Sequence, residues 1–183
     1  MKLVTYDAIK NIKKIGVPTD YSDTLLNFVK EYRHKVDDLQ DINWVACKFL
    51  DEDTRNYYVW WCVNKVRHLM KDKRSVEAVD ILKLYIDGNA TIEELMIANE
   101  YAAIARDACA ANLANYGSAD DGEWYYTYFA ACAAYYASAV IRVSDADVYY
   151  VANSAANSAW YIHQSNKQFN LQIDKLIEIL ENK

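Results

Sequence analysis

The sequence predicts an all-α protein, a single-domain bundle of about eight helices with a central core rich in alanine and tyrosine. Hydrophobic residues make up 53% of the 183 residues, and one proline and four glycines leave little material for the turns of a β-sandwich or barrel. About one residue in three of the stretch 98–159 is alanine, the best helix former. Because alanine is small, helices lined with it approach closely and leave the large Tyr and Trp rings to fill the gaps.

Residues 1–183 are expected to form one domain, with N-terminal helices over 1–74 and the alanine-rich core over 75–183. In the N-terminal part, apolar residues recur at helical spacing. The first helix stops at Gly16, ahead of Pro18, and Asp53 can cap the last one. The expected helices are 6–15, 19–36 with its cap, 41–50 and 53–70.

The alanine-rich part contains clear start and stop signals. Ser75 can cap its first helix, and Asp87-Gly88-Asn89 ends that helix in the manner of a glycine C-cap. Thr91 and Glu94 form a capping box that opens the next helix. The expected helices are 75–86, 91–116, 124–142, 144–163 and 169–180.

The helix 91–116 is expected to be covered by neighbours over most of its surface. Its acidic residues repeat every seven positions and predict a narrow solvent-exposed edge, formed by Glu93, Glu100 and Asp107. Its apolar residues are expected to face inward, namely Ile97, Tyr101, Ile104, Ala108 and Ala111.

Residues 124–141 contain no charge, which by length alone would permit a membrane span. They consist mostly of Ala and Tyr with few aliphatic residues, so a central bundle helix wrapped by neighbours explains them better. The first residues contain no apolar run of the length that a signal peptide needs. The four cysteines, Cys47, Cys62, Cys109 and Cys132, lie far apart in apolar contexts and are interpreted as buried thiols. A cytoplasmic location without a membrane partner follows as the expectation.

A net charge of −6 and a pI near 5.1 disfavour nucleic acid as a ligand and favour a protein partner, which could be basic. The sequence also allows a homo-oligomer. It lacks the GxGxxG, GxxxxGK, HExxH, GxSxG and paired CxxC motifs. His68 and His163 have no acidic residue three or four positions before them, and Glu31, three positions before His34, gives one ExxH spacing where a helical metal site uses a pair. We therefore expect no cofactor, no metal and no catalytic residues.

Four polar residues fall on helix faces that are expected to be buried: Asn99, Arg106, Asn153 and Asn157. Buried polar groups need partners. One interpretation is a hydrogen-bond network that fixes the register of the helices. The alternative is a pocket for a small anionic ligand, in which case the protein could sequester a nucleotide-like signal.

The chain also contains several adjacent pairs of aromatic residues. Because neighbouring positions of a helix point about 100° apart, both members of such a pair cannot easily be equally buried, and some of the rings should reach the surface. Tyr and Trp dominate protein-binding hot spots. A candidate partner-binding patch therefore combines acidic and aromatic residues of one loop and helix start: Asp120, Asp121, Glu123, Trp124, Tyr125 and Tyr126. Alternatively, the acidic residues cap a helix and the rings fill space beside alanines.

The segments 75–80, 88–95 and 102–108, the later alanine blocks and the tail 176–180 resemble immunity proteins of bacterial polymorphic-toxin systems, and uncharacterised phage proteins are similar. In that family a helix ends in a glycine, a short acidic step opens the next helix, and Ala-Ala-x-x-Ala-Arg blocks follow. The resemblance covers about 75–180. It implies a non-catalytic helical protein that binds and blocks another macromolecule, either a cognate toxin or, in a phage, a host defence component.

Overall fold

Helices dominate the computed structural model of the protein. The structure describes residues 3–10, 18–34, 39–116, 123–139, 154 and 165–183. Its helices are, in chain order, α1 (Tyr6–Ile9), α2 (Leu25–Tyr32), α3 (Leu39–Phe49), α4 (Glu52–Lys65), the 3₁₀ turn η1 (Arg67–Leu69), α5 (Lys73–Ile86), α6 (Ile92–Tyr116), α7 (Glu123–Ala139) and α9 (Ser165–Glu181). The prediction of an all-α helical bundle is confirmed.

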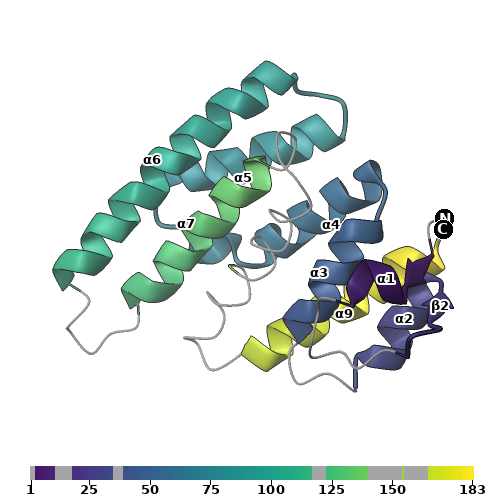
Figure 1. Ribbon diagram of the computed structural model, residues 1–183. Helices are drawn as coiled ribbons and strands as arrows, with labels where there is room; N and C mark the ends of the chain where they lie inside the picture. The colour runs from purple at the N-terminus through teal and green to yellow at the C-terminus, as the bar shows by residue number, and fades with distance from the viewer. Residues whose placement is uncertain (1–2, 11–17, 35–38, 117–122, 140–153, 155–164) are drawn as a thin grey trace.

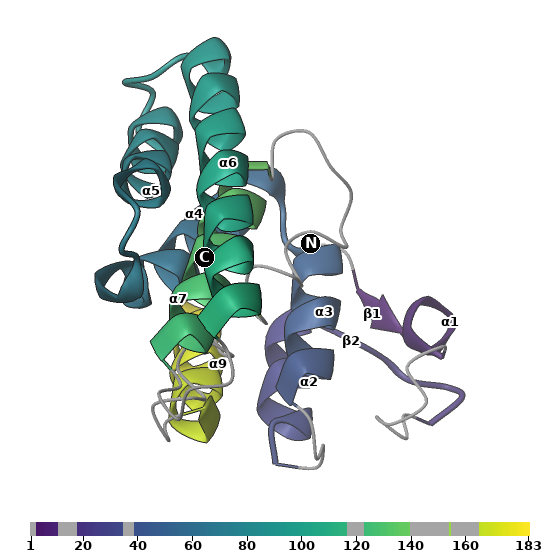
Figure 2. The same ribbon diagram turned by 90° about the vertical axis from the view of Figure 1, so that its left-hand side faces the viewer.

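The helices form two groups that are joined through α4 (Figures 1 and 2). In one group α5, α6 and α7 each pack against the other two. In the other group α2, α3 and α9 do the same. The longest helix, α6, has 25 residues, and among the described elements it packs extensively only against α5 and α7. One side of α6 is therefore left without a helical neighbour in the described part of the chain.

A two-stranded antiparallel sheet precedes α2 and was not predicted from the sequence. Strand β1 (Val4–Thr5) pairs with β2 (Ser22–Asp23). The Tyr6 amide then donates to the Tyr21 carbonyl at 3.0 Å and extends the pairing. Strands of two residues are too short to show an alternating pattern, so hydrophobic periodicity gave no signal for them. Of the expected helix 6–15, the structure shows α1, and residues 11–17 lie outside the described residues.

The start of α4 lies two residues earlier than predicted. Asp51, not Asp53, is the N-cap, because its carboxylate accepts hydrogen bonds from the amide and the hydroxyl of Thr54 at 3.1 and 2.8 Å. The helix also ends earlier than expected, at Lys65, and the chain tightens into η1 before residue 70.

The caps of α2 and α5 also differ from the expected ones. The Thr24 hydroxyl caps α2 by accepting from the Asn27 amide at 3.2 Å. The Asp72 carboxylate caps α5 by accepting from the Arg74 amide at 3.0 Å, and Ser75 is buried inside the helix. The observed cap of α2 thus lies later in the chain than the expected one, and the observed cap of α5 lies three residues earlier.

The junction between α5 and α6 confirms both predicted signals. Gly88 has a φ of 75°, and the Asn89 amide donates to the Leu84 carbonyl at 2.7 Å, the pattern of a glycine-terminated helix. The Thr91 amide donates to the Glu94 carboxylate at 2.7 Å, and the Glu94 amide donates to the Thr91 hydroxyl at 3.2 Å. Five residues between the helices make α5 and α6 antiparallel neighbours (Figure 2).

The hydrophobic core is continuous between the two groups of helices. One cluster of buried residues includes Val4 near one end of the chain, Val79 and Leu82 of α5, and Leu180 of α9. α7 contributes mainly small side chains to this cluster: Ala130, Ala133, Ala134 and Ala137. It packs against α4, α5 and α6, as expected of a central helix. Among the described residues, no helix combines the length and the apolar content that crossing a membrane requires.

A buried polar network holds α9 against α3 and α4. The Tyr58 hydroxyl donates to Asn43 Oδ1 at 2.7 Å, and Asn43 Nδ2 donates to Gln172 Oε1 at 2.9 Å. All three side chains are at least 99% buried. Because each of these buried polar groups has a partner, the network fixes how the three helices sit against one another.

The C-terminal helix is longer than predicted, since α9 begins at Ser165 instead of residue 169. Ion pairs at the surface join it to α2, between Lys30 and Glu181 at 2.5 Å and between Arg33 and Asp174 at 2.7 Å. The expected helix 144–163 and the end of the expected helix 124–142 lie outside the described residues, apart from Ser154, which is helical and buried.

Candidate functional site

α6 has apolar side chains on two faces, and the faces differ in the size of those side chains. The face that packs against α5 and α7 is built mainly from small residues, with Ala98, Ala102 and Ala105 buried. Leu95 and Cys109 are buried on the same side. Small side chains let the backbones of neighbouring helices come close together.

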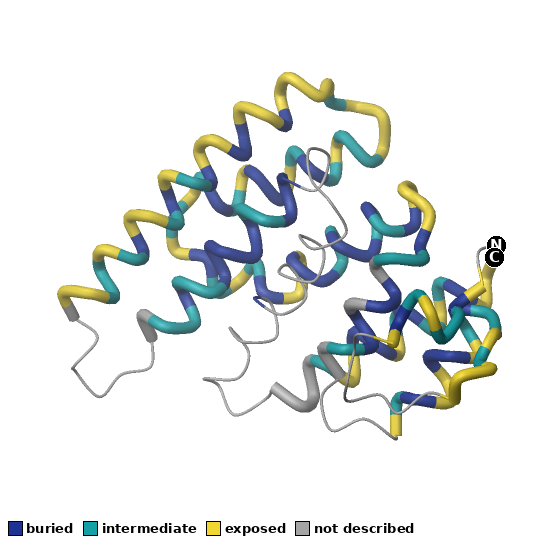
Figure 3. Tube along the Cα trace, in the orientation of Figure 1, coloured by how far each residue is buried: buried dark blue, intermediate teal, exposed yellow. Residues whose placement is uncertain are grey.

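The bulky residues form an exposed stripe, which we call the outer face of α6 and which consists of Ile97, Tyr101, Ile104, Ala108 and Ala111. The exposed fractions of the three large side chains are 53%, 52% and 51%. Figure 3 shows exposed positions recurring along α6 on the side turned away from its neighbours. The prediction that these five residues face inward is therefore wrong. The alanines occupy the space between helices and turn the larger side chains outward.

Acidic residues border the outer face of α6 along its length. Glu93, Glu100 and Asp107 repeat every seven residues and are exposed, as predicted. Asp107 forms an ion pair with Arg106 at 2.7 Å. Glu93 and Glu100 have no ion-pair partner within the described part of the chain. The stripe is thus apolar at its centre and negatively charged along one edge.

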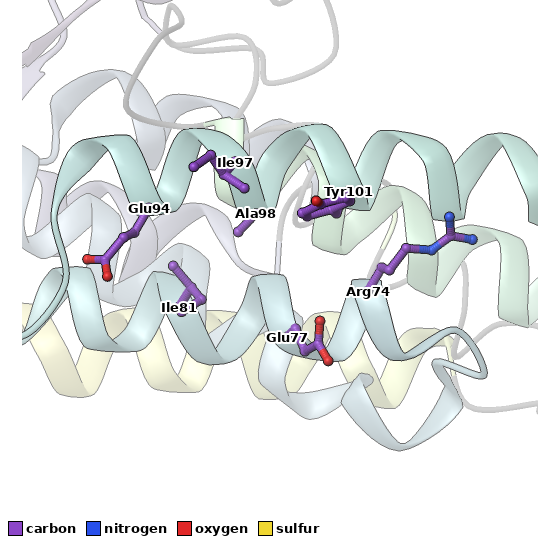
Figure 4. Close-up of a pocket in the computed structure, with 7 residues that line it drawn as sticks. All are labelled: Arg74, Glu77, Ile81, Glu94, Ile97, Ala98 and Tyr101. Carbon is purple, nitrogen blue, oxygen red and sulfur yellow. The ribbon is translucent and has the colours of Figure 1, made fainter.

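A cavity of about 220 Å³ lies along the other edge, between α5 and α6. Its lining residues are Arg74, Glu77 and Ile81 from α5 with Glu94, Ile97, Ala98 and Tyr101 from α6. Figure 4 shows Ile81 and Ala98 between the two helices, with Ile97 and Tyr101 above them. The Arg74 guanidinium binds the Asp72 carboxylate through two nitrogens, at 2.9 and 2.6 Å. Its positive charge is therefore already compensated within the chain.

Asn99 joins α6 to α7. Its side-chain nitrogen donates to the Tyr135 carbonyl at 2.9 Å and to the Ser138 hydroxyl at 3.0 Å. The Ser138 hydroxyl lies within hydrogen-bond distance of the Ala134 carbonyl, at 2.9 Å. Asn99 is 93% buried, so both of its donor hydrogens are used inside the interface. These contacts support its interpretation as a residue that fixes helix register.

Arg106 is also directed at α7. Its guanidinium carbon lies 4.2 Å from the centre of the Tyr135 ring, within the range of a cation–π contact, and its charge is paired with Asp107. Asn99 and Arg106 thus both contact Tyr135, one through its carbonyl and one through its ring. Asn153 and Asn157 lie outside the described residues, so the ligand pocket that would combine all four residues stays a prediction.

The predicted acidic and aromatic patch at the start of α7 is only partly described. Asp120 and Asp121 lie outside the described residues, and Glu123 and Trp124 form the first turn of α7. Tyr125 and Tyr126 are half-buried. The patch therefore stays a prediction, and most of the large apolar side chains that the structure exposes on this group of helices belong to α6, with Leu84 of α5 as a further one.

The cysteines are buried where their side chains are described. Cys62, Cys109 and Cys132 are free thiols, and Cys47 belongs to α3. Burial raises the pKa of Cys62 to about 12, so its thiol is protonated near neutral pH. Within the described ranges, no three His, Cys, Asp or Glu side chains come together as metal ligands would.

The chain matches no known protein family, curated protein or solved structure. The resemblance of residues 75–180 to immunity proteins accordingly stays a prediction. The outer face of α6 is the site that sequence reasoning missed. The sequence pattern that could have revealed this face is the presence of two apolar faces on one helix, one of small and one of large residues. The face of small residues suits close helix packing better.

Proposed function

We propose that the protein acts without catalysis, by binding a partner protein and blocking it in the manner of an immunity protein or inhibitor. The partner would be a toxin or, if the chain comes from a phage, a component of host defence. The observation that carries this proposal is the outer face of α6. Folded monomers rarely leave large apolar side chains in a contiguous exposed stripe, and such stripes mark interaction sites.

The composition of the outer face of α6 supports a protein partner. Tyr101 lies between two isoleucines, and each of the three side chains is about half exposed. Amphipathic tyrosine is enriched in protein interfaces, where its ring is buried and its hydroxyl finds a polar partner. The acidic edge formed by Glu93, Glu100 and Asp107 would form the polar rim that surrounds an interface core.

Affinity capture from a native lysate tests this function. The full-length chain is immobilised under gentle conditions, and bound proteins are identified by mass spectrometry and quantified against the bait. A partner recovered in a fixed stoichiometric ratio, whose own activity falls when the chain is added, is the expected result. Recovery of no protein partner, or of one whose activity does not change, would contradict the proposal. The genes beside the coding sequence supply the first partner to test, because an immunity protein is encoded next to its toxin.

A further inference from the structure

The outer face of α6 has the geometry and charge of a docking site for one kind of segment, and we infer that this segment is a basic amphipathic helix of the partner protein. This inference rests on the proposed function and adds to it the chemistry of the bound element. It also assigns the contacts to one helix of the chain, with its acidic edge and the adjoining cavity.

The spacing of the outer face favours a helical occupant. Positions 97, 101, 104, 108 and 111 follow one another at alternating intervals of four and three, the arrangement of the apolar seam of a coiled coil. A seam of this kind presents holes between its side chains that receive the apolar side chains of a second helix. The stripe is bordered by the antiparallel helix α5, so a docked helix would also contact the groove between α5 and α6.

The cavity in that groove has the size of an anchor site. Its volume of about 220 Å³ exceeds the roughly 150 Å³ that holds a benzene ring in a protein core. Ile81, Ile97 and Tyr101 supply an apolar lining. Figure 4 shows that the lining residues come from both helices and leave the space between them open. A leucine or phenylalanine of the docked helix would fit there.

The charge around the stripe selects a basic occupant. α6 carries four acidic side chains and one basic side chain, and that one, Arg106, is paired with Asp107. Glu77 of α5 and Glu94 of α6 add negative charge beside the cavity, where the charge of Arg74 is compensated by Asp72. Complementary charge speeds encounter and disfavours wrong partners. Lys and Arg residues flanking the apolar seam of the docked helix would meet this field.

The same charge disfavours a second copy of the chain as the occupant. Pairing two α6 helices through their outer faces would bring the edge formed by Glu93, Glu100 and Asp107 close to its own copy or leave it without a complement. The stretch 140–164, of which the structure describes only Ser154, contains one arginine against two aspartates. A second copy of α6 and the stretch 140–164 therefore both lack the positive charge that would complement the acidic edge.

Two synthetic peptides test the inference with the full-length chain. Each has three heptads, about 31 Å as a helix, with leucine at the apolar seam. One carries lysine at the flanking positions and the other carries glutamate. Fluorescence anisotropy of the labelled peptides gives the dissociation constants. We expect the lysine peptide to bind at least about tenfold more tightly than the glutamate peptide, and to weaken as salt is raised from 50 to roughly 300 mM.

Matched variants place the binding on α6. Ile104→Lys keeps a good helix former and puts the new charge near Glu100 and Asp107, so its melting temperature should stay within about 3 °C of the wild type. The substitution should raise the dissociation constant of the lysine peptide by about tenfold or more. The control is Leu171→Lys, at an exposed leucine of α9 (41% exposed) in the other group of helices. It should leave binding unchanged.

A second variant separates charge from shape. Replacing Glu93 and Glu100 together by glutamine keeps the size of the side chains and removes the charge of the acidic edge. Binding of the lysine peptide should weaken roughly three- to tenfold and lose most of its salt dependence.

Four results would overturn the inference: no binding of either peptide, equal binding of both, binding that Ile104→Lys does not weaken, or sedimentation showing a dimer that Ile104→Lys dissociates. The capture experiment separates these results from failure of the proposed function. If the Ile104→Lys variant still captures a stoichiometric partner, the outer face of α6 is not the docking site, although the proposed inhibitor function is unaffected. Failure to capture any partner would remove the function itself.

Discussion

Asp51 joins two distant parts of the chain at the start of α4. Its carboxylate accepts hydrogen bonds from Lys183, near the end of α9, and from the backbone and side chain of Thr54. The hydrogen bond from Lys183, together with those from Thr54, lowers the pKa of Asp51 to about 2, although partial burial acts in the opposite direction. The folded protein therefore prefers the charged carboxylate more strongly than the unfolded chain does.

Replacing Asp51 by alanine should lower the free energy of unfolding by about 1 kcal/mol at neutral pH, as expected for loss of an N-cap. Because the pKa is depressed in the folded state, this stabilisation is complete above about pH 4 and is lost as the pH falls toward 2. Urea unfolding at several pH values measures it. Asp53→Ala, two residues further along in the first turn of α4, is the control. A difference between wild type and Asp51→Ala that persists unchanged at pH 2 would contradict the assignment.

Asn99 holds α6 against α7, because both hydrogens of its amide nitrogen are used between the two helices. Asn99→Ala should destabilise the protein by about 1 to 3 kcal/mol, since it leaves the Tyr135 carbonyl without this donor. Thermal and urea unfolding provide the measurement. Asn115→Ala, at an exposed position of the same helix, should have an effect below about 0.5 kcal/mol. An unchanged melting temperature for Asn99→Ala would favour the ligand-pocket interpretation instead.

At the scale of single elements, the sequence predicts helix ends well where two signals agree. The expected start of α6 at residue 91 is its capping residue, and its expected end at 116 is the observed end, because the capping box of Thr91 and Glu94 marks the start and Gly117 marks the end. The starts of α4 and α5 were misplaced because two candidate capping side chains stood close together. Which one wins depends on backbone geometry that composition does not reveal.

The turn after α5 depends on one backbone conformation. Gly88 has a φ of 75°, and a Cβ atom added there would meet no other atom within 4 Å. The cost of a side chain at this position is therefore conformational and not steric crowding by neighbours. We expect Gly88→Ala to lower the free energy of unfolding by about 1 kcal/mol.

Gly88→Asn is the matched variant, because asparagine adopts positive φ more readily than alanine and should cost clearly less. Chemical denaturation of both variants compares them directly. Equal losses for alanine and asparagine would show that the positive φ is not what the turn requires.

At the scale of the whole molecule, α9 closes the core although it comes last in the chain. Ile173, Leu176 and Leu180 are buried in the cluster that begins at Val4, and Gln172 completes the polar network with α3 and α4. Burial of three such side chains stabilises a fold by roughly 5 to 9 kcal/mol, comparable with the total stability of a typical domain.

Removing residues 165–183 should therefore abolish cooperative unfolding and expose apolar surface to a hydrophobic dye. Removing only residues 182–183 eliminates the exposed ion pair between Lys183 and Asp51 and should cost less than about 1 kcal/mol. Circular dichroism during heating distinguishes the two chains. A sharp transition in the shorter chain, close to that of the full chain, would show that α9 is dispensable for folding.

The fold class could be predicted from composition, but the candidate site could not. Alanine content and helical spacing indicate a bundle, and they do not indicate which apolar stripe of α6 faces the neighbouring helices. Ile97, Tyr101 and Ile104 have the spacing of a core stripe, so periodicity assigned them to the interior. Their exposure follows from the close approach of α5 and α7, a property of the packed molecule that no segment of the sequence displays by itself.

Small residues lie on the packed face of α6 and large residues on its outer face, so the two faces are under different evolutionary constraints. Substitutions at the alanines between the helices disturb the core, whereas substitutions at 97, 101 and 104, whose side chains are about half exposed, mainly change the surface of the molecule. Under the proposed function, a lineage of such proteins could alter its recognition specificity through a few positions of one helix while the scaffold stays the same. In a contest between an inhibitor and a changing target, that freedom allows rapid adaptation.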